Sequence, residues 1–224
     1  TYTHNTNGYL TSIQWTPTSS SSFVYDVMGN LKQTTLTSGA VHTFDHDGLD
    51  RRVTKSIGGT LQWRAVYENN LRIAAYVNNT AGNLAKEFVY ATRVNVPDYM
   101  ISGGVKYRIV TDHLGSPRLM VKTTDGTIAQ RMDYNVLGEV KADTNPNFQP
   151  FGFAGGIYEP GVQLVRFGAR DYDPRNTGRW TSKDPIRFDS NDTNLYGYVL
   201  SDPINFKDIN GLWAFSVDVF AGSG

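Results

Sequence analysis

One short unit recurs along the first two thirds of the 224-residue chain and limits what the chain can fold into. In each copy an aromatic or Asp residue ends a strand, two or three residues follow, and a Gly precedes a polar and an aliphatic residue. The clearest copy spans Tyr25 to Leu31, a second spans Phe44 to Leu49, and looser copies cover 2–10, 78–84, 112–119 and 134–140. Asp or Asn accepts hydrogen bonds from turn N–H groups and Gly adopts positive φ, so the unit predicts β-hairpins.

Hairpins of this size cannot bury their own apolar faces, so they must pair side by side in a continuous, strongly twisted sheet. The 13 Tyr, 11 Phe and 22 Gly also favour strands joined by tight turns, and the sequence predicts an all-β fold. An ordinary β-sandwich with generic Gly turns is the alternative. Strands with alternating polar and apolar residues are expected at Leu61–Tyr67, Arg72–Val77, Glu87–Tyr90, Lys106–Thr111 and Leu119–Lys122.

Composition argues against several classes of function. The 21 Lys and Arg residues balance the 21 Asp and Glu residues, so no overall field would attract nucleic acid or an anionic membrane. The absence of Cys excludes disulfides, cysteine-ligated zinc and a thiol nucleophile. No apolar run approaches the 18 residues of a membrane helix. We therefore expect neither a nucleic-acid partner nor a membrane span.

No residue pattern predicts a metal or another cofactor. Of the four His residues, only His42 and His46 are close in sequence, and they flank a turn. The Asp residues at 45, 47 and 50 resemble a calcium loop, but the bidentate Glu that should follow is missing. A hairpin accounts for this segment better.

A polar, turn-rich segment from Asp143 to Asn147 ends the repeats. It divides the chain into repeats at 1–147, a C-terminal module at 148–212 and a tail at 213–224. The tail alternates in polarity over 213–220, which predicts either one strand added to an open edge or a disordered end. The module carries denser motifs, which are Phe151–Gly156, Leu164–Pro174, Gly178–Pro185, Asn194–Val199 and Asp202–Leu212.

The module motifs, taken in the order in which they occur, resemble the core-associated module of RHS/YD-repeat proteins. Thr111–Arg118 also resembles a string that this family carries shortly before the module. The resemblance implies that the repeats form part of a β cocoon around a toxic C-terminal polypeptide and that the module plugs this shell. It implies a secreted or cell-surface bacterial effector. The partners would be its own C-terminal cargo and components of a secretion system or toxin complex.

The resemblance also implies self-cleavage between Leu212 and Trp213 by an aspartate pair at Asp184 and Asp208, a single-turnover aspartyl autoprotease. Two carboxylates held close cannot both ionise easily, so they share one proton while one activates water and the other protonates the carbonyl. Arg179 could orient one carboxylate and lower its pKa, or it could only clamp the turn. The closing motif has Ile209 where the family most often has Pro, which keeps the chemical groups but removes a φ constraint.

Two functions remain open at this stage. Each aspartate could be a simple turn cap, because Asp before Pro and Asp three residues before Gly are both common in turns. The chain would then be a non-catalytic secreted or surface β-repeat protein for adhesion or for carbohydrate or protein binding. The two functions differ in whether Asp184 and Asp208 converge near the bond after Leu212.

Overall fold

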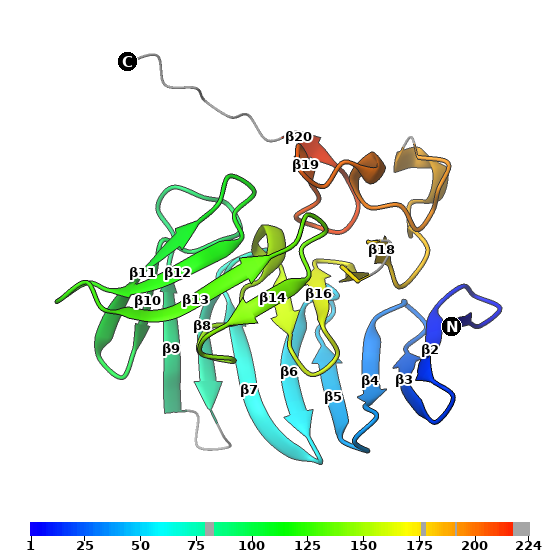
Figure 1. Cartoon of the computed structure of the whole chain (residues 1–224), viewed down its shortest axis with the longest axis horizontal. Coiled ribbons are helices and arrows are strands. Elements are labelled where there is room, and N and C mark those ends of the chain that lie inside the picture. Colours follow the sequence, from blue (N-terminus) through cyan, green and yellow to red (C-terminus); the bar gives the residue numbers. More distant parts are fainter. Residues whose placement is uncertain (79–82, 176–177, 191, 217–224) are drawn as a thin grey trace.

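The computed structural model describes residues 1–78, 83–175, 178–190 and 192–216, and its regular structure is almost entirely β (Figure 1). Fourteen strands form one antiparallel sheet in which every strand pairs with its neighbour in the chain. This confirms the all-β prediction and rules out a generic sandwich. The strands are β1 (Tyr2–His4), β2 (Leu10–Thr16), β3 (Ser19–Tyr25), β4 (Leu31–Thr35), β5 (Val41–His46), β6 (Arg52–Ile57), β7 (Thr60–Tyr67), β8 (Ile73–Asn78), β9 (Asn83–Val89), β10 (Tyr99–Ser102), β11 (Val105–Thr111), β12 (Pro117–Lys122), β13 (Ile128–Tyr134) and β14 (Val140–Asp143).

The five strands expected from sequence correspond to β7, β8, β9, β11 and β12, with ends that differ by at most four residues. The largest difference is in β9, which begins at Asn83 rather than at Glu87 because Asn83 and Leu84 pair with Asn78 and Val77 of β8. The connection from 79 to 82, where one looser copy of the unit was predicted, lies outside the described residues.

The repeat turns share one backbone hydrogen bond, and an Asp or Asn side chain caps each of them, supplied by Asn69 in the turn that begins at Glu68. The Oδ1 atom of Asp26 accepts hydrogen bonds from the backbone N–H groups of Met28 and Asn30, each at 2.9 Å, and Gly29 has a φ of 87°. The first four such turns begin at Asn5, Asp26, Asp47 and Glu68, each 21 residues after the one before. A backbone N–H bond from the first residue to the carbonyl of the fifth closes each of them. The regular spacing places these turns along one rim of the sheet.

The second copy of the unit folds in a register different from the predicted one. Its turn begins at Asp47, whose Oδ1 accepts from the N–H groups of Leu49 and Arg51, and Asp45 instead pairs with Thr54 and Lys32. Asp50, with a φ of 58°, occupies the left-handed position that we assigned to Gly48. Strand pairing on either side fixes this register, and Asp tolerates the left-handed conformation better than most residues.

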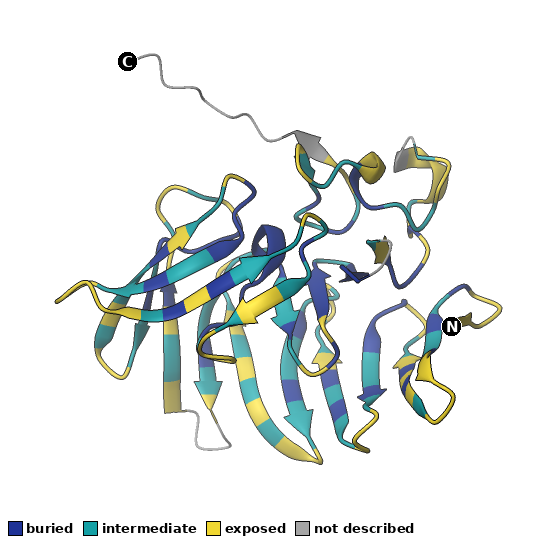
Figure 2. Cartoon of the chain, viewed as in Figure 1, coloured by how far each residue is buried: buried dark blue, intermediate teal, exposed yellow. Residues whose placement is uncertain are grey.

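The C-terminal module lies against the concave face of the large sheet (Figure 1). It contains a sheet of β15 (Ile157–Glu159), β16 (Leu164–Phe167), β17 (Arg170–Asp173) and β18 (Arg179–Trp180). Every residue of β16 and β17 is buried, as Figure 2 shows for the centre of the molecule. Strands covered on both faces need long apolar side chains or paired charges, and both occur here.

Three apolar clusters hold the molecule together, and all of them join the large sheet to the module. One packs Leu10, Phe23 and Phe44 against Leu164. A second packs Ile73, Phe88 and Met100 against Phe151. The third surrounds Tyr172 with Leu114, Phe167, Trp180 and Tyr198. The hydrophobic core therefore lies between the two parts of the chain.

The rest of the described chain adds three short 3-10 helices, η1 (Phe153–Gly155), η2 (Arg187–Ser190) and η3 (Val199–Ser201), and one small hairpin. This hairpin pairs β19 (Phe206–Lys207) with β20 (Phe215–Ser216). The predicted tail strand is thus present over two residues, and 217–224 lie outside the described residues. No helix in the described part of the chain is long and apolar enough to cross a membrane.

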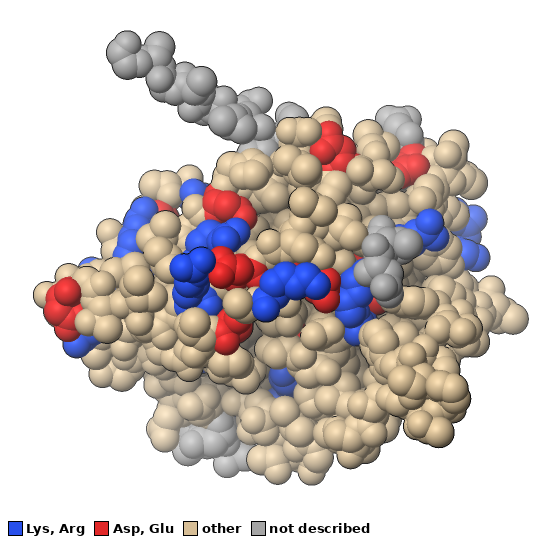
Figure 3. All heavy atoms as spheres, viewed as in Figure 1, with Lys and Arg blue, Asp and Glu red and all other residues tan. Residues whose placement is uncertain are grey.

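The charged side chains are mixed on the surface. Figure 3 shows acidic and basic residues interspersed on one face instead of gathered by sign. Arg118 and Arg131 both pair with Asp133, and Lys141 pairs with Glu139. This arrangement agrees with the equal numbers of acidic and basic residues.

Candidate functional site

Asp184 and Asp208 meet at one guanidinium group, that of Arg170. The Nη2 atom of Arg170 lies 2.9 Å from Oδ2 of Asp184 and 3.4 Å from Oδ2 of Asp208. The two aspartates are only 6% and 3% exposed. The structure therefore places both sequence-predicted carboxylates beside a single buried cation.

Arg170 begins β17, and neighbouring strands fix its position. Its guanidinium carbon lies 4.1 Å from the centre of the Trp180 ring in β18, an attractive cation–π contact. Trp180 is thus the residue of the Gly-Arg-Trp string that contacts the cation. Four residues later, Asp184 is held by a backbone bond from its N–H to the Leu195 carbonyl, and its Oδ1 accepts from the N–H of Ile186 at 3.0 Å.

Asp208 caps the closing loop of the module. Its Oδ1 accepts hydrogen bonds from the backbone N–H groups of Gly211 at 2.8 Å and Leu212 at 3.1 Å. The N–H group of Asn210 lies at 3.3 Å from the same oxygen. This is the geometry of the repeat turns, used here to hold the backbone beside the carboxylate pair.

Two glycines allow the closing loop to lie directly on the turn between β16 and β17. A Cβ atom on Gly211, whose φ is 73°, would lie 2.3 Å from the Phe167 carbonyl oxygen. A Cβ atom on Gly168 would lie 2.3 Å from the Asn210 carbonyl oxygen. In this close packing the Asn210 carbonyl accepts from the N–H of Ala169 at 3.0 Å. Only glycine fits at either position.

The peptide groups around Leu212 are held from two sides. The Nε atom of Arg170 donates to the Gly211 carbonyl, so the cation contacts the backbone as well as both carboxylates. The Oδ1 atom of Asn210 accepts from the N–H groups of Leu212 at 3.0 Å and Trp213 at 3.3 Å. The predicted scissile bond therefore follows directly after the loop that carries Asp208.

Burial changes the proton affinity of both carboxylates. It raises the pKa of Asp208 to about 6, although Arg170 and the backbone N–H groups act in the opposite direction. Burial also raises the pKa of Asp184 above its usual value, against the same opposing charge. A buried pair of this kind can hold one proton near neutral pH, which is what acid–base chemistry requires.

Arg179, the predicted helper, lies elsewhere. Its side chain is exposed and lines a cleft of about 630 Å³ together with Tyr2, His4 and Tyr196. Asp184 and Arg170 line a different cleft of about 650 Å³, between the repeat turns and the segment that begins at Ser182. Arg170 thus holds the place that we expected for Arg179. Sequence reasoning missed it because a charge inside an apolar strand motif does not reveal its partner.

The described residues contain no group of three or more side chains that could hold a metal ion. His42 and His46 lie at opposite ends of β5 and do not converge.

A long meander of Asp- and Gly-bearing hairpins, curved around a buried C-terminal module, defines a YD-shell protein. The Teneurin YD-shell family model matches residues 1–204, and the chain belongs to this family. The expected relationship to YD-repeat, RHS-type proteins is confirmed.

Teneurin-3 of Danio rerio is 33% identical over 181 residues, which cover 75% of this chain and 6% of that protein. Teneurin-4 of Mus musculus is 32% identical over 209 residues, covering 88% of this chain and 7% of that protein. The tRNA3(Ser)-specific nuclease WapA of Bacillus spizizenii is 23% identical over 78% of this chain and 8% of its own length. The chain therefore spans less than a tenth of these relatives.

Solved structures share the fold. The Photorhabdus luminescens Tc holotoxin pore, which carries a TccC3 variant, matches 95% of this chain with a TM-score of 0.68 and 20% identity, over 11% of its own chain. A TcdB2–TccC3–Cdc42 structure matches 95% of this chain with a TM-score of 0.67 and 19% identity, over 13% of its own chain.

Proposed function

We propose that this chain is part of a shell that encloses a C-terminal cargo polypeptide and releases it by cleaving its own backbone after Leu212. One observation carries the proposal. Two buried carboxylates, Asp184 and Asp208, share one guanidinium directly beside the loop that leads to the Leu212–Trp213 bond.

The arrangement supports hydrolysis by an aspartate pair. Asp208, with a pKa raised to about 6, carries the shared proton, and ionised Asp184 accepts a proton from water. The water oxygen attacks the Leu212 carbonyl carbon while Asp208 protonates the carbonyl oxygen. When the tetrahedral intermediate collapses, the C–N bond breaks, the Trp213 nitrogen takes the proton from Asp184 and one hydroxyl proton returns to Asp208. The products are a Trp213 amine and a Leu212 carboxylic acid, whose proton then passes to the amine or to water.

The solved neighbours support an enclosing role. They are parts of Tc toxin assemblies, and one was solved together with Cdc42. By this likeness, the partners of the present chain are its own C-terminal cargo and toxin-complex or secretion-system components. We propose a secreted or surface location, and the bacterial nuclease WapA among the relatives supports a bacterial effector.

A second candidate is a non-catalytic shell that binds a protein or carbohydrate partner at a cell surface. The bonding of Asp208 favours it, because three backbone N–H groups converge on Oδ1 just as N–H groups converge on turn caps elsewhere in the chain. The higher identity to the teneurins than to WapA points the same way.

Intact mass spectrometry of the chain separates the two candidates. Self-cleavage gives a fragment ending at Leu212 and a peptide beginning at Trp213, which N-terminal sequencing identifies. Asp184→Asn and Asp208→Asn should each prevent the cut. Asp202→Asn is the matched control, because Asp202 caps a turn of the same module away from Arg170. A wild-type chain that stays intact would favour the non-catalytic shell.

A further inference from the structure

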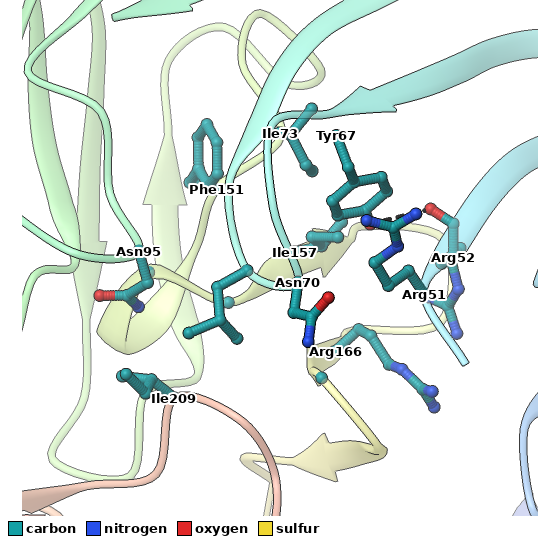
Figure 4. Close-up of a pocket in the computed structure, with 14 residues that line it drawn as sticks. Arg51, Arg52, Tyr67, Asn70, Ile73, Asn95, Phe151, Ile157, Arg166 and Ile209 are labelled. Carbon is teal, nitrogen blue, oxygen red and sulfur yellow. Dashed lines mark hydrogen bonds between the residues drawn. The ribbon is translucent and has the colours of Figure 1, made fainter. Parts of the chain in front are cut away.

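A small pocket lies at the seam between the large sheet and the C-terminal module (Figure 4). Its volume is about 40 Å³. The sheet contributes Arg51, Arg52 and the turn at Asn70, and the module contributes Arg166 and Ile209. Three arginines line the pocket, and no acidic residue does so within the described part of the chain. Basic residues without acidic partners are unusual in the lining of a pocket among buried side chains.

Arg52 leaves part of its guanidinium unsatisfied although it is only 1% exposed. Its Nη2 lies 3.0 Å from Oδ1 of Asp171, but its Nη1 is 3.8 Å from Oε1 of Glu159, too far for a hydrogen bond. Neither its Nε nor its Nη1 has a hydrogen-bond partner among the described residues.

Arg166, which is 3% exposed, also has a guanidinium N–H group without a hydrogen-bond partner. Its Nη1 pairs with Oδ2 of Asp171 at 3.0 Å, and its Nη2 donates to Asn30 at 2.7 Å and to the Asp50 carbonyl at 3.1 Å. Its Nε has no partner in the residues that the structure describes. One carboxylate, that of Asp171, therefore serves both buried guanidinium groups.

The buried charges at the seam do not cancel. Arg52, Arg166 and Lys55 are three cations, whereas Glu159 and Asp171 are two anions, and Lys55 pairs with Glu159. All five are at most 6% exposed, so solvent cannot compensate for the difference.

The other ionisable groups nearby are neutral, paired or partly exposed, so they are not counted among the buried charges. His46 is neutral, since burial, Arg52 and Arg166 lower its pKa to about 2. Arg51 is matched by Asp47 at 2.6 Å. The Asp50 carboxylate is partly exposed and accepts from the Asn30 side chain at 2.7 Å. The buried network thus keeps one excess positive charge, and such a charge is costly without a counterion.

We propose that this pocket binds one small monovalent inorganic anion, with chloride as the physiological ligand, held by Arg52 and Arg166. The volume is enough for a single small ion or for a few water molecules. The ion neutralises the excess charge and accepts hydrogen bonds from the unpartnered N–H groups. It binds only the docked arrangement, because sheet and module supply one arginine each.

Diffraction from crystals of the chain soaked in bromide tests the site directly. We expect an anomalous peak within hydrogen-bond distance of both guanidinium groups. In solution, replacing gluconate with chloride at constant ionic strength should raise the melting temperature by about 2–4 °C, because a ligand that binds only the folded state stabilises it. Crystals without such a peak, or a melting temperature equal in both salts, would overturn the proposal and leave the pocket to water.

A substitution at the mouth of the pocket adds a test that does not disturb the buried arginines. Asn70 is exposed and lines the pocket, so Asn70→Asp supplies a carboxylate from the protein itself. The rise in melting temperature that chloride causes should be at most half as large in this variant as in the wild type. Asn83→Asp makes the same change at an exposed position in β9 and should keep the full shift. Equal shifts in both variants would contradict the assigned position.

Discussion

At the scale of single residues, Arg170 organises the candidate site. It contacts Asp184, Asp208, the Gly211 carbonyl and the Trp180 ring, so one side chain joins its own motif to two others that are separate in sequence, Gly178–Pro185 and Asp202–Leu212. A cation between two buried carboxylates lowers the cost of holding them together, yet burial still raises the pKa of both. Asp208 is therefore held at an energetic cost when it is ionised.

This cost predicts how stability varies with pH. The pKa of Asp208 is about 6 in the folded chain and 3.8 when unperturbed, so the folded state binds the proton more tightly. This tighter proton binding by Asp208 stabilises the folded chain fully below pH 3.8, and the stabilisation is lost as the pH rises through about 6. The loss is about 3 kcal/mol. The side-chain amide introduced by Asp208→Asn does not titrate but keeps the acceptor oxygen of the cap.

Urea denaturation of wild type and Asp208→Asn from pH 4 to pH 7 measures this difference. The free energy of unfolding of the variant should rise relative to wild type by about 2 kcal/mol over this range. Asp202→Asn, at a partly exposed turn cap away from Arg170, is the control. A constant difference between wild type and Asp208→Asn would mean that the pKa of Asp208 is not raised.

At the scale of elements, the site depends on close backbone packing between the closing loop and the turn from β16 to β17. Gly211→Ala should disrupt this packing, because its φ is 73° and its new Cβ would lie 2.3 Å from the Phe167 carbonyl. Gly39 is a matched control, since its φ is 82° and no described atom lies within 4 Å of an added Cβ.

Gly39→Ala should lower the free energy of unfolding by about 1–2 kcal/mol, which is the cost of placing a side chain on a left-handed backbone. Gly211→Ala should lose clearly more and should also stop cleavage, because the loop can no longer hold Asp208 against Arg170. Urea denaturation and intact mass measure the two effects. If both variants lost the same free energy of unfolding, the closing loop would not be packed as described.

At the scale of the whole molecule, the large sheet and the module stabilise each other. Their three shared apolar clusters and the buried pairs of Arg52 with Asp171 and Lys55 with Glu159 all cross the seam. A sheet of 14 strands with one apolar face needs such a cover. The site belongs to the module, but its geometry depends on the sheet around it.

Local chemistry made much of this fold predictable. An Asp or Asn followed within a few residues by Gly indicates a turn, so the turns that begin at Asn5, Asp26, Asp112 and Asn135, together with five of the strands, could be located from sequence alone. The register at Asp47 could not, because pairing with distant strands decided between Asp50 and Gly48. The same limit applies to the site. Asp184 and Asp208 were found through ordered motifs, whereas the contact of Arg170 with Asp208, 38 residues away, depends on tertiary packing.

The central claim, that this pair cleaves the chain after Leu212, is tested most directly by the rate at which a Trp213 N-terminus appears between pH 5 and pH 8. The reaction requires protonated Asp208, whose pKa is about 6, so the rate should fall about tenfold for each pH unit above 6.5. The rate should be lost in Asp184→Asn. A rate that rises with pH, or no cleavage at any pH in this range, would contradict the claim.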